Sequence, residues 1–174
     1  MTLNLTNKSD FVNSFLFPLS RIGNNCVLKL NGNGISTLLS AADNTVVLYG
    51  IYETELGSDI DTKLNIPDLQ RLIKVLQCVD VDSMAIEVEK NKIKYSSADL
   101  RFKYHLLSDG ILSIPPLNIE KIKQLTYDTT FTIPYSSFVS LLKSSTFTLS
   151  LNKMYFFTKD GKVYAEINDK ESHN

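Results

Sequence analysis

One pattern occurs three times in this chain, and that repeat limits the folds open to it more than any other feature. Residues 64–77 read LNIPDLQRLIKVLQ: a short apolar lead, a proline, and then apolar residues at helical spacing. Residues 131–145, FTIPYSSFVSLLKSS, follow the same order, and residues 9–21, SDFVNSFLFPLSR, repeat the helical part. We expect three short amphipathic helices with buried stripes formed by Phe11, Phe15, Leu16 and Leu19, by Leu69, Leu72, Ile73 and Leu76, and by Phe138, Leu141 and Leu142.

Capping residues and prolines suggest where these helices begin and end. Ser9, followed by Asp10, suits the N-cap of the first helix. Pro67 and Pro134 fit the first turn of the other two helices, where a missing N–H costs nothing. Pro18 lies inside the first pattern, so we expect it to kink or end that helix.

The segment after each helix alternates apolar and polar residues in short runs, which is typical of β-strands. These segments are residues 26–50, 83–107 and 147–168. Turn dipeptides divide them, at Asn31-Gly32, Asn33-Gly34, Asp43-Asn44, Asn91-Lys92 and Asp160-Gly161. The leads LNL, TKLNI and TTFTI are predicted to be short strands that enter the helices. The repeating unit is therefore a strand, a helix and about three antiparallel strands, which predicts an α+β fold.

The stretch between the second and third units, residues 108–128, fits neither helix nor strand periodicity. It contains Gly110 and the pair Pro115-Pro116, which favours a stiff, extended path. We therefore predict a linker here, and the chain divides into a complete domain of two repeats at 1–107, a linker at 108–125 and the first half of a second domain at 126–174.

The composition is that of a globular chain: 43% of the 174 residues are hydrophobic and 21% are charged, which suits a packed core. The net charge of −1 gives no global attraction to nucleic acid, although a local basic face would still bind it. For Cys26 and Cys78 we expect two buried thiols in a reducing compartment. No run approaches the roughly 20 apolar residues that span a bilayer, and the N-terminus lacks a signal-peptide pattern. We expect a cytoplasmic protein with no membrane partner.

Residues that carry enzyme chemistry are scarce. His105 lies in a strand pattern and His173 in the polar tail, and neither has a Cys or His at metal-ligand spacing. The NGNG stretch at 31–34 favours a turn over a phosphate loop, because no Gly-Lys-Ser/Thr follows it. The carboxylates of SDIDT (58–62) and DVDS (80–83) favour solvated loops, because cation sites need more oxygen ligands. We expect no catalytic residue, metal or cofactor, and therefore a protein that is not an enzyme.

The polar faces of the three predicted helices contain few acidic residues. Only Asp10 and Asp68 occur there, near the helix N-termini, where they complement the helix dipole. The other polar residues are Asn13, Ser14 and Ser20 with Lys8 and Arg21 on the first helix, Gln70, Arg71, Lys74 and Gln77 on the second, and Ser136, Ser137, Ser140 and Lys143 on the third. These residues fit two interpretations, a solvated surface or a surface that binds nucleic-acid phosphates.

The order and spacing of the units resemble those of DNA polymerase sliding clamps, and especially the clamps of T-even-type bacteriophages. The matching stretches are IPDLQRLIKVL, NKIKYSSADLRFKY leading into SIPP, and MYFFTKDGKVYAEINDKES. The resemblance covers nearly the whole chain as a pattern, and no single motif in it is diagnostic. A phage clamp subunit would have four units, whereas this sequence has three, so we expect a chain truncated at its C-terminus.

The resemblance implies the DNA-clamp fold, with two units per domain and helices that line a central hole and face duplex DNA. The implied DNA-facing residues are Lys8, Arg21, Gln70, Arg71, Lys74 and Lys143. Clamps also hold tail peptides of the polymerase and clamp loader in a groove beside the linker, for which the candidates are Tyr104, Leu107, Ile111, Leu112, Ile114 and Leu117. Alternatively, these apolar residues pack the linker onto its own sheet.

These expectations describe a DNA replication protein, a processivity factor that encircles duplex DNA and tethers the replicative polymerase without catalysis. For the phage type, the resemblance implies a ring of three subunits in the host cytoplasm. The alternative is a non-enzymatic α+β scaffold that binds only proteins and does not encircle DNA.

Overall fold

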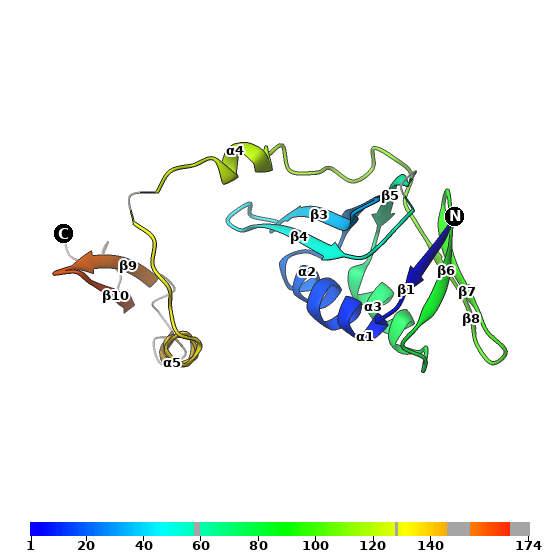
Figure 1. The fold of residues 1–174 in the computed structure, drawn as a ribbon. Helices are drawn as coiled ribbons and strands as arrows, with labels where there is room; N and C mark the ends of the chain where they lie inside the picture. The colour runs from blue at the N-terminus through cyan, green and yellow to red at the C-terminus, as the bar shows by residue number, and fades with distance from the viewer. Residues whose placement is uncertain (58–59, 128, 146–153, 168–174) are drawn as a thin grey trace. The chain divides into compact units, whose positions relative to one another are not determined.

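The computed structural model describes residues 1–57, 60–127, 129–145 and 154–167, and the chain divides into two compact units (Figure 1). Unit 1 comprises Met1–Glu120 and unit 2 comprises Lys121–Asn174. Unit 1 holds the first two copies of the repeat, and the described part of unit 2 holds the third.

Unit 1 begins with strand β1 (Thr2–Leu5) and one continuous helical segment. This segment consists of α1 (Lys8–Asp10), a π-helical stretch, η1 (Phe11–Leu16), and α2 (Phe17–Ile22). Its N-cap is Asn7, whose side-chain oxygen accepts the backbone N–H of Asp10. The prediction of a Ser9 N-cap is therefore wrong, because Asn7 already satisfies an N–H of the first turn.

Pro18 does not end the first helix. The N–H of Phe17 donates to the carbonyl of Val12, five residues earlier, at the end of the π-helical stretch. A π-turn at this point accommodates the proline, which has no N–H to donate. The helix therefore continues to Ile22.

Two four-stranded antiparallel sheets in unit 1 each combine strands from both repeats. Their orders are β4-β3-β2-β5 and β1-β6-β7-β8. The remaining strands are β2 (Cys26–Asn31), β3 (Gly34–Ser40), β4 (Val47–Glu53), β5 (Asp61–Ile66), β6 (Met84–Glu89), β7 (Lys92–Ser96) and β8 (Arg101–His105). Since β1 pairs with β6 and β5 pairs with β2, each repeat contributes its leading strand to the sheet of the other. This reciprocal exchange joins the two repeats into one body.

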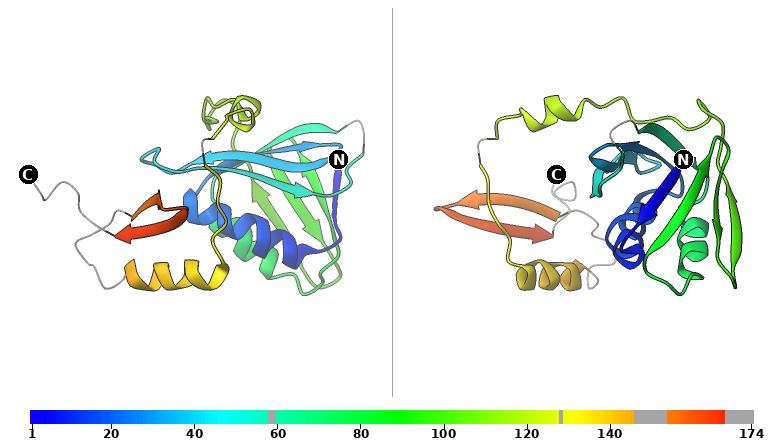
Figure 2. Two further views of the ribbon diagram at one scale, coloured as in Figure 1. Left: turned by 60° about the vertical axis from the view of Figure 1, so that its left-hand side comes forward. Right: turned by 45° about the vertical axis from the view of Figure 1, so that its right-hand side comes forward.

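The core of unit 1 lies between the helices and the sheets. Helix α3 (Leu69–Gln77) lies beside the first helical segment, and the strands flank both (Figure 2). The first two predicted stripes are confirmed, because all of their residues are buried: Phe11, Phe15, Leu16, Leu19, Leu69, Leu72, Ile73 and Leu76. Burying each such side chain stabilises the fold by about 1.5–3 kcal/mol, so tertiary packing rather than helix propensity holds these short helices.

Residues 106–118 contain no regular helix or strand and lead into the short helix α4 (Ile119–Lys123), which has no buried residue. The predicted linker, residues 108–125, thus includes one helical turn that its sequence pattern did not indicate. The bounds of the linker and of the two predicted domains stay predictions.

Unit 2 contains helix α5 (Tyr135–Ser145) and a hairpin of β9 (Met154–Lys159) and β10 (Lys162–Ile167). The hairpin turns at Asp160 and Gly161, which have φ angles of 51° and 71°, as their sequence predicts. The predicted leading strand at 129–133 is not formed, because a lead strand needs the sheet of a second repeat and the described part of unit 2 contains only one. The start of the third strand segment, residues 147–153, lies outside the described residues.

The stripe predicted for the third helix is not buried. Phe138 is 43% exposed and Leu142 is 50% exposed. In unit 1 the helices of two repeats lie beside one another, whereas the described residues of unit 2 provide a single repeat. This part of the prediction is therefore wrong for the described structure, because no second helix covers α5 there.

The two cysteines differ in environment. Cys26 is buried in β2, and burial raises the pKa of its thiol to about 12. Cys78 is exposed at the C-terminal end of α3, so the prediction of a buried thiol is wrong at this position. Across the part of the chain that the structure describes, no helix has the length and apolar character needed to cross a membrane.

Candidate nucleic-acid interface

The solvent face of α3 is polar and carries two cations. Gln70, Arg71, Lys74 and Gln77 are all exposed. They lie opposite the buried stripe because an α-helix turns by about 100° per residue. Among the described residues, neither Arg71 nor Lys74 forms an ion pair. Both cations are therefore available to an anionic partner.

Hydrogen bonds fix the N-terminal end of α3 and so the position of Arg71. The Asp68 carboxylate accepts a hydrogen bond from the backbone N–H of Arg71 at 2.9 Å, and the backbone N–H of Leu69 donates to the Asn24 carbonyl at 2.7 Å. The Tyr104 hydroxyl donates to the backbone carbonyl of Asp68 at 2.7 Å and accepts a hydrogen bond from the backbone N–H of Asp68 at 3.1 Å. Burial raises the pKa of Tyr104 from 10.0 to about 12, so this hydroxyl keeps its proton, and can donate, further into the alkaline range than an exposed tyrosine.

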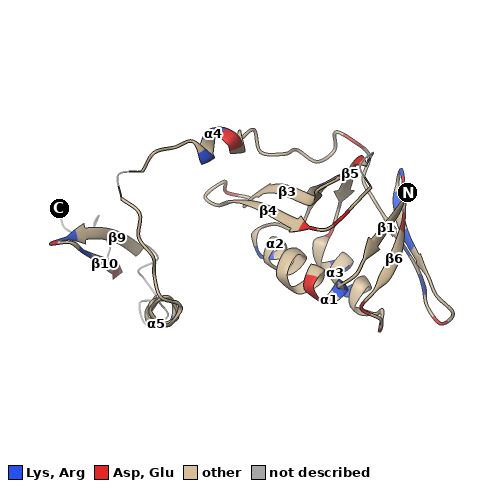
Figure 3. Cartoon of the chain, in the orientation of Figure 1, with Lys and Arg blue, Asp and Glu red and all other residues tan. Residues whose placement is uncertain are grey.

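The first helical segment contributes one exposed cation and one buried one. Arg21 is exposed, and its guanidinium lies 4.7 Å from the centroid of the Phe17 ring, a cation–π contact. Lys8 is only 8% exposed, and its ammonium donates to the Val79 carbonyl. The prediction that Lys8 is an exposed, DNA-facing residue is therefore wrong, because the start of α1 packs onto the loop after α3. At α1, basic and acidic residues occur together (Figure 3).

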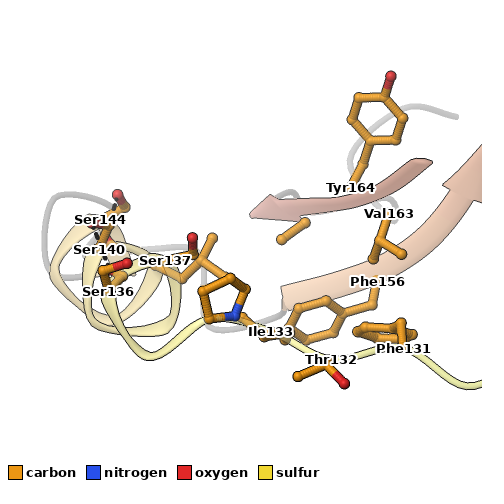
Figure 4. Close-up of a pocket in the computed structure, with 13 residues that line it drawn as sticks. Phe131, Thr132, Ile133, Ser136, Ser137, Ser140, Ser144, Phe156, Val163 and Tyr164 are labelled. Carbon is orange, nitrogen blue, oxygen red and sulfur yellow. Dashed lines mark hydrogen bonds between the residues drawn. The ribbon is translucent and has the colours of Figure 1, made fainter.

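Three serines of the third helix are exposed and line one side of a groove beside the hairpin. Ser136, Ser137 and Ser140 line an open groove whose other wall includes Phe156 and Val163 (Figure 4). The Ser140 hydroxyl also donates to the Ser136 carbonyl at 3.0 Å, a bond within the helix. All three serines are exposed, which agrees with the polar face predicted for this helix. Lys143 is exposed on the same helix.

The predicted peptide groove is only partly a surface. Tyr104 is 3% exposed, and its hydroxyl is already bonded to Asp68. The prediction that Tyr104 lines the peptide groove is therefore wrong, because Tyr104 belongs to the core. Ile111 and Leu117 are 61% and 43% exposed. The other three candidates, which are half-buried, are Leu107, Leu112 and Ile114.

Other polar motifs have structural roles. The NGNG stretch forms the predicted turn, in which the Asn31 side chain accepts the Asn33 N–H at 3.1 Å. In DVDS, the Asp82 carboxylate accepts the Ser9 hydroxyl at 2.6 Å and the Ser9 N–H at 2.7 Å, which lowers the pKa of Asp82. The SDIDT stretch lies partly outside the described residues. Within those that are described, no cluster of three His, Cys, Asp or Glu could hold a metal.

Comparison with known proteins adds the fold to this geometry. No protein-family model and no curated protein matches the sequence. Among solved structures, the chain aligns over 98% of its length with DNA polymerase III subunit beta from Pseudomonas aeruginosa, with a TM-score of 0.68 and 15% identity. It aligns equally far with the PCNA2–PCNA3 complex from Sulfolobus tokodaii, with a TM-score of 0.64 and 14% identity. The chain has the DNA sliding-clamp fold.

This confirms the predicted α+β clamp fold of repeated strand–helix–strand units. The alignment spans 47% of the Pseudomonas chain and 69% of the Sulfolobus chain. A Helicobacter pylori beta clamp bound to a DNA ligase peptide matches 68% of this chain over 34% of its own length, with a TM-score of 0.53 and 14% identity. At these identities the sliding-clamp likeness describes the fold alone.

Proposed function

We propose that this chain is a DNA sliding clamp of the T-even bacteriophage type, a processivity factor that acts in the host cytoplasm. We further propose a complete domain at 1–107, a linker at 108–125 and the first half of a second domain at 126–174. The observation that carries the proposal is the sliding-clamp fold combined with Arg71 and Lys74, which are exposed on the solvent face of α3 and form no ion pair with any residue that the structure describes.

The mechanism requires no bond chemistry from this chain. Arg71, Lys74, Arg21 and Lys143, with Gln70 beside them, would face the phosphates of duplex DNA without reading its sequence. A closed ring would then keep the polymerase near its template. The tether raises the effective concentration of the polymerase at the primer end, so the enzyme rebinds before it diffuses away. No cofactor enters this scheme.

The partners in this proposal are duplex DNA, other copies of the chain in a ring of three full-length subunits, and tail peptides of the polymerase and clamp loader. The exposed Ile111 and Leu117, with the half-buried Leu107, Leu112 and Ile114, would form the apolar surface for these peptides. Exposed apolar side chains of this linker are a suitable binding surface for a short peptide, because binding removes apolar surface from water.

The test is a double charge reversal, Arg71→Glu with Lys74→Glu. Each cation that neutralises a phosphate contributes about 0.9 to the slope of log affinity against log salt. We therefore expect duplex binding to weaken and the slope to fall by about 2, together with a loss of polymerase stimulation. The matched control is Lys63→Glu with Lys90→Glu, two exposed lysines outside the helices.

The two variants carry the same change in net charge, so the comparison isolates position. If both weaken DNA binding equally, or if neither affects DNA binding or polymerase stimulation, α3 does not face DNA. The second result would favour a scaffold that binds only proteins.

A further inference from the structure

Asn65 is buried on the side of its strand that does not face the core. In β5, side chains alternate between the two faces of the sheet. Leu64 and Ile66 belong to the core cluster and are 4% and 0% exposed. Asn65 lies between them and therefore faces away from the core, yet it is only 6% exposed. A separate segment of the chain must cover it.

Hydrogen bonds identify that segment as the start of the stretch between β8 and α4. The Leu107 N–H donates to the Asn65 carbonyl at 3.0 Å. The Asn65 side-chain amide donates to the Leu107 carbonyl at 3.3 Å and to the Asp109 carboxylate at 2.8 Å. We call the two side-chain bonds from Asn65 the linker anchor. One residue earlier, the Leu106 N–H donates to the Asn91 carbonyl at 2.9 Å.

The chain therefore crosses from one sheet of unit 1 to the other at residues 106 and 107. Asn91 lies in the turn between β6 and β7, whereas Asn65 lies in β5 of the other sheet. Leu107 is the point at which the chain leaves the sheets, and the apolar residues Ile111 and Leu112 follow it. The path of these residues away from the two sheets depends on how Leu107 and Asp109 are held.

The first repeat contains an asparagine, Asn4, at the position equivalent to Asn65. Leu3-Asn4-Leu5 in β1 has the same pattern as Leu64-Asn65-Ile66 in β5, and both strands are leading strands at a sheet edge. Leu3 and Leu5 are buried, whereas Asn4 is exposed. An asparagine at this position is therefore not buried by the strand itself. The difference at Asn65 comes from residues 107–109.

We propose that Asn65 is a positioning residue that anchors the start of the linker to β5 and thereby sets the position of the apolar residues after it. The amide suits this role because one NH2 group can donate to a carbonyl and a carboxylate together. Leucine has no donor, and aspartate would place a second carboxylate next to Asp109. The part of the inference that concerns peptide binding rests on the proposed function, whereas the anchor does not.

The experiment measures amide hydrogen exchange in the full 174-residue chain. The Leu107 N–H is a suitable reporter, because its own acceptor is the Asn65 backbone carbonyl, which every substitution retains. In Asn65→Leu we expect exchange at Leu107 to become at least about tenfold faster, since a partly buried carbonyl and a carboxylate lose their donor. The Leu106 amide should keep its wild-type rate.

Two further variants separate the anchor from general damage. Asn4→Leu is the matched control, because it makes the same substitution in the equivalent strand position without touching the linker, and exchange at Leu107 should be unchanged. Asn65→Asp should release the linker as Asn65→Leu does. Adding Asp109→Asn to Asn65→Asp reverses donor and acceptor in the 65–109 bond but leaves the Leu107 carbonyl without its side-chain donor, so this double variant should slow exchange at Leu107 relative to Asn65→Asp without reaching the wild-type rate.

The second readout is binding of a synthetic tail peptide of the polymerase that the proposed function takes as partner. We expect about tenfold weaker binding in Asn65→Leu and wild-type binding in Asn4→Leu. Unchanged exchange at Leu107 in Asn65→Leu would overturn the anchor. Faster exchange with unchanged peptide affinity would overturn the positioning role. If the wild-type chain binds no peptide, the peptide surface of the proposed function fails, and the exchange result alone decides the anchor.

Discussion

Replacing Tyr104 by phenylalanine should destabilise unit 1, and it is the sharpest test of how α3 is held. The substitution removes one oxygen atom from a side chain that is 3% exposed, and it leaves the aromatic ring in place. That hydroxyl donates to the Asp68 carbonyl at 2.7 Å and accepts the Asp68 N–H at 3.1 Å. Both backbone groups lie at the N-terminal end of α3.

The expected cost follows from these two bonds. A buried backbone group left without a partner costs roughly 1–3 kcal/mol. Asp68 is half-buried, so water reaches its backbone groups in part and the lower end of the range applies to each. We expect a loss of about 2 kcal/mol in the free energy of unfolding. For a unit of this size, that corresponds to a fall in the melting midpoint of roughly 8 °C.

The assay is urea and thermal unfolding of the full chain, followed by far-ultraviolet circular dichroism. Tyr52→Phe is the matched control, because the Tyr52 hydroxyl donates to the Asn7 carbonyl over 3.3 Å at an exposed site. That bond should contribute less than about 0.5 kcal/mol. If Tyr104→Phe keeps the wild-type midpoint and spectrum, the two bonds do not hold α3, and the argument from buried polar groups is refuted.

Three other predictions concern the core, pH and thiol chemistry. Ile66→Ala, at a fully buried position of β5, should cost about 2–5 kcal/mol in urea unfolding, whereas Leu117→Ala, at a 43% exposed position, should cost less than about 0.5 kcal/mol. The pKa values of Tyr104 and Cys26 are about 12 in the folded chain, above their ordinary values of 10.0 and 9.0. The folded state therefore retains protons that the unfolded state releases. The free energy of unfolding should have its full value below about pH 9 and should fall as the pH rises toward 12. A constant free energy of unfolding in urea titrations across that range would contradict this prediction. A thiol reagent should modify Cys78 in the native protein and reach Cys26 only after unfolding, and rapid native modification of both thiols would show that β2 is not buried.

The helices of unit 1 could be predicted because their signal is local. Apolar residues at helical spacing must share one face, and that face must leave water. The stripes containing Leu16 and Leu72 were therefore predictable and are buried. The same rule did not hold for Phe138, because a stripe becomes buried only where another element covers it, and the described part of unit 2 contains one repeat.

The exposure of individual side chains was less predictable. Lys8 has the sequence context of a solvated residue, and only the loop after α3 takes its ammonium out of water. For Tyr104 a signal was present, since alternation along β8 places it on the face opposite Arg101 and Lys103. Asn65 could not be recognised at all, because it shares its local pattern with the exposed Asn4.

The sequence by itself determined the repeating unit, the α+β class, the positions of most turns and the polar residues of α3. These properties depend on neighbours within a few residues, whose spacing is fixed by the helix and strand periods of 3.6 and 2. Only the tertiary structure decided that each repeat places its leading strand in the other's sheet, and that Asn65 holds the start of the linker. Those contacts join residues that are 30 or more positions apart, and nothing in the local pattern specifies which distant partner a strand edge or a buried amide will find.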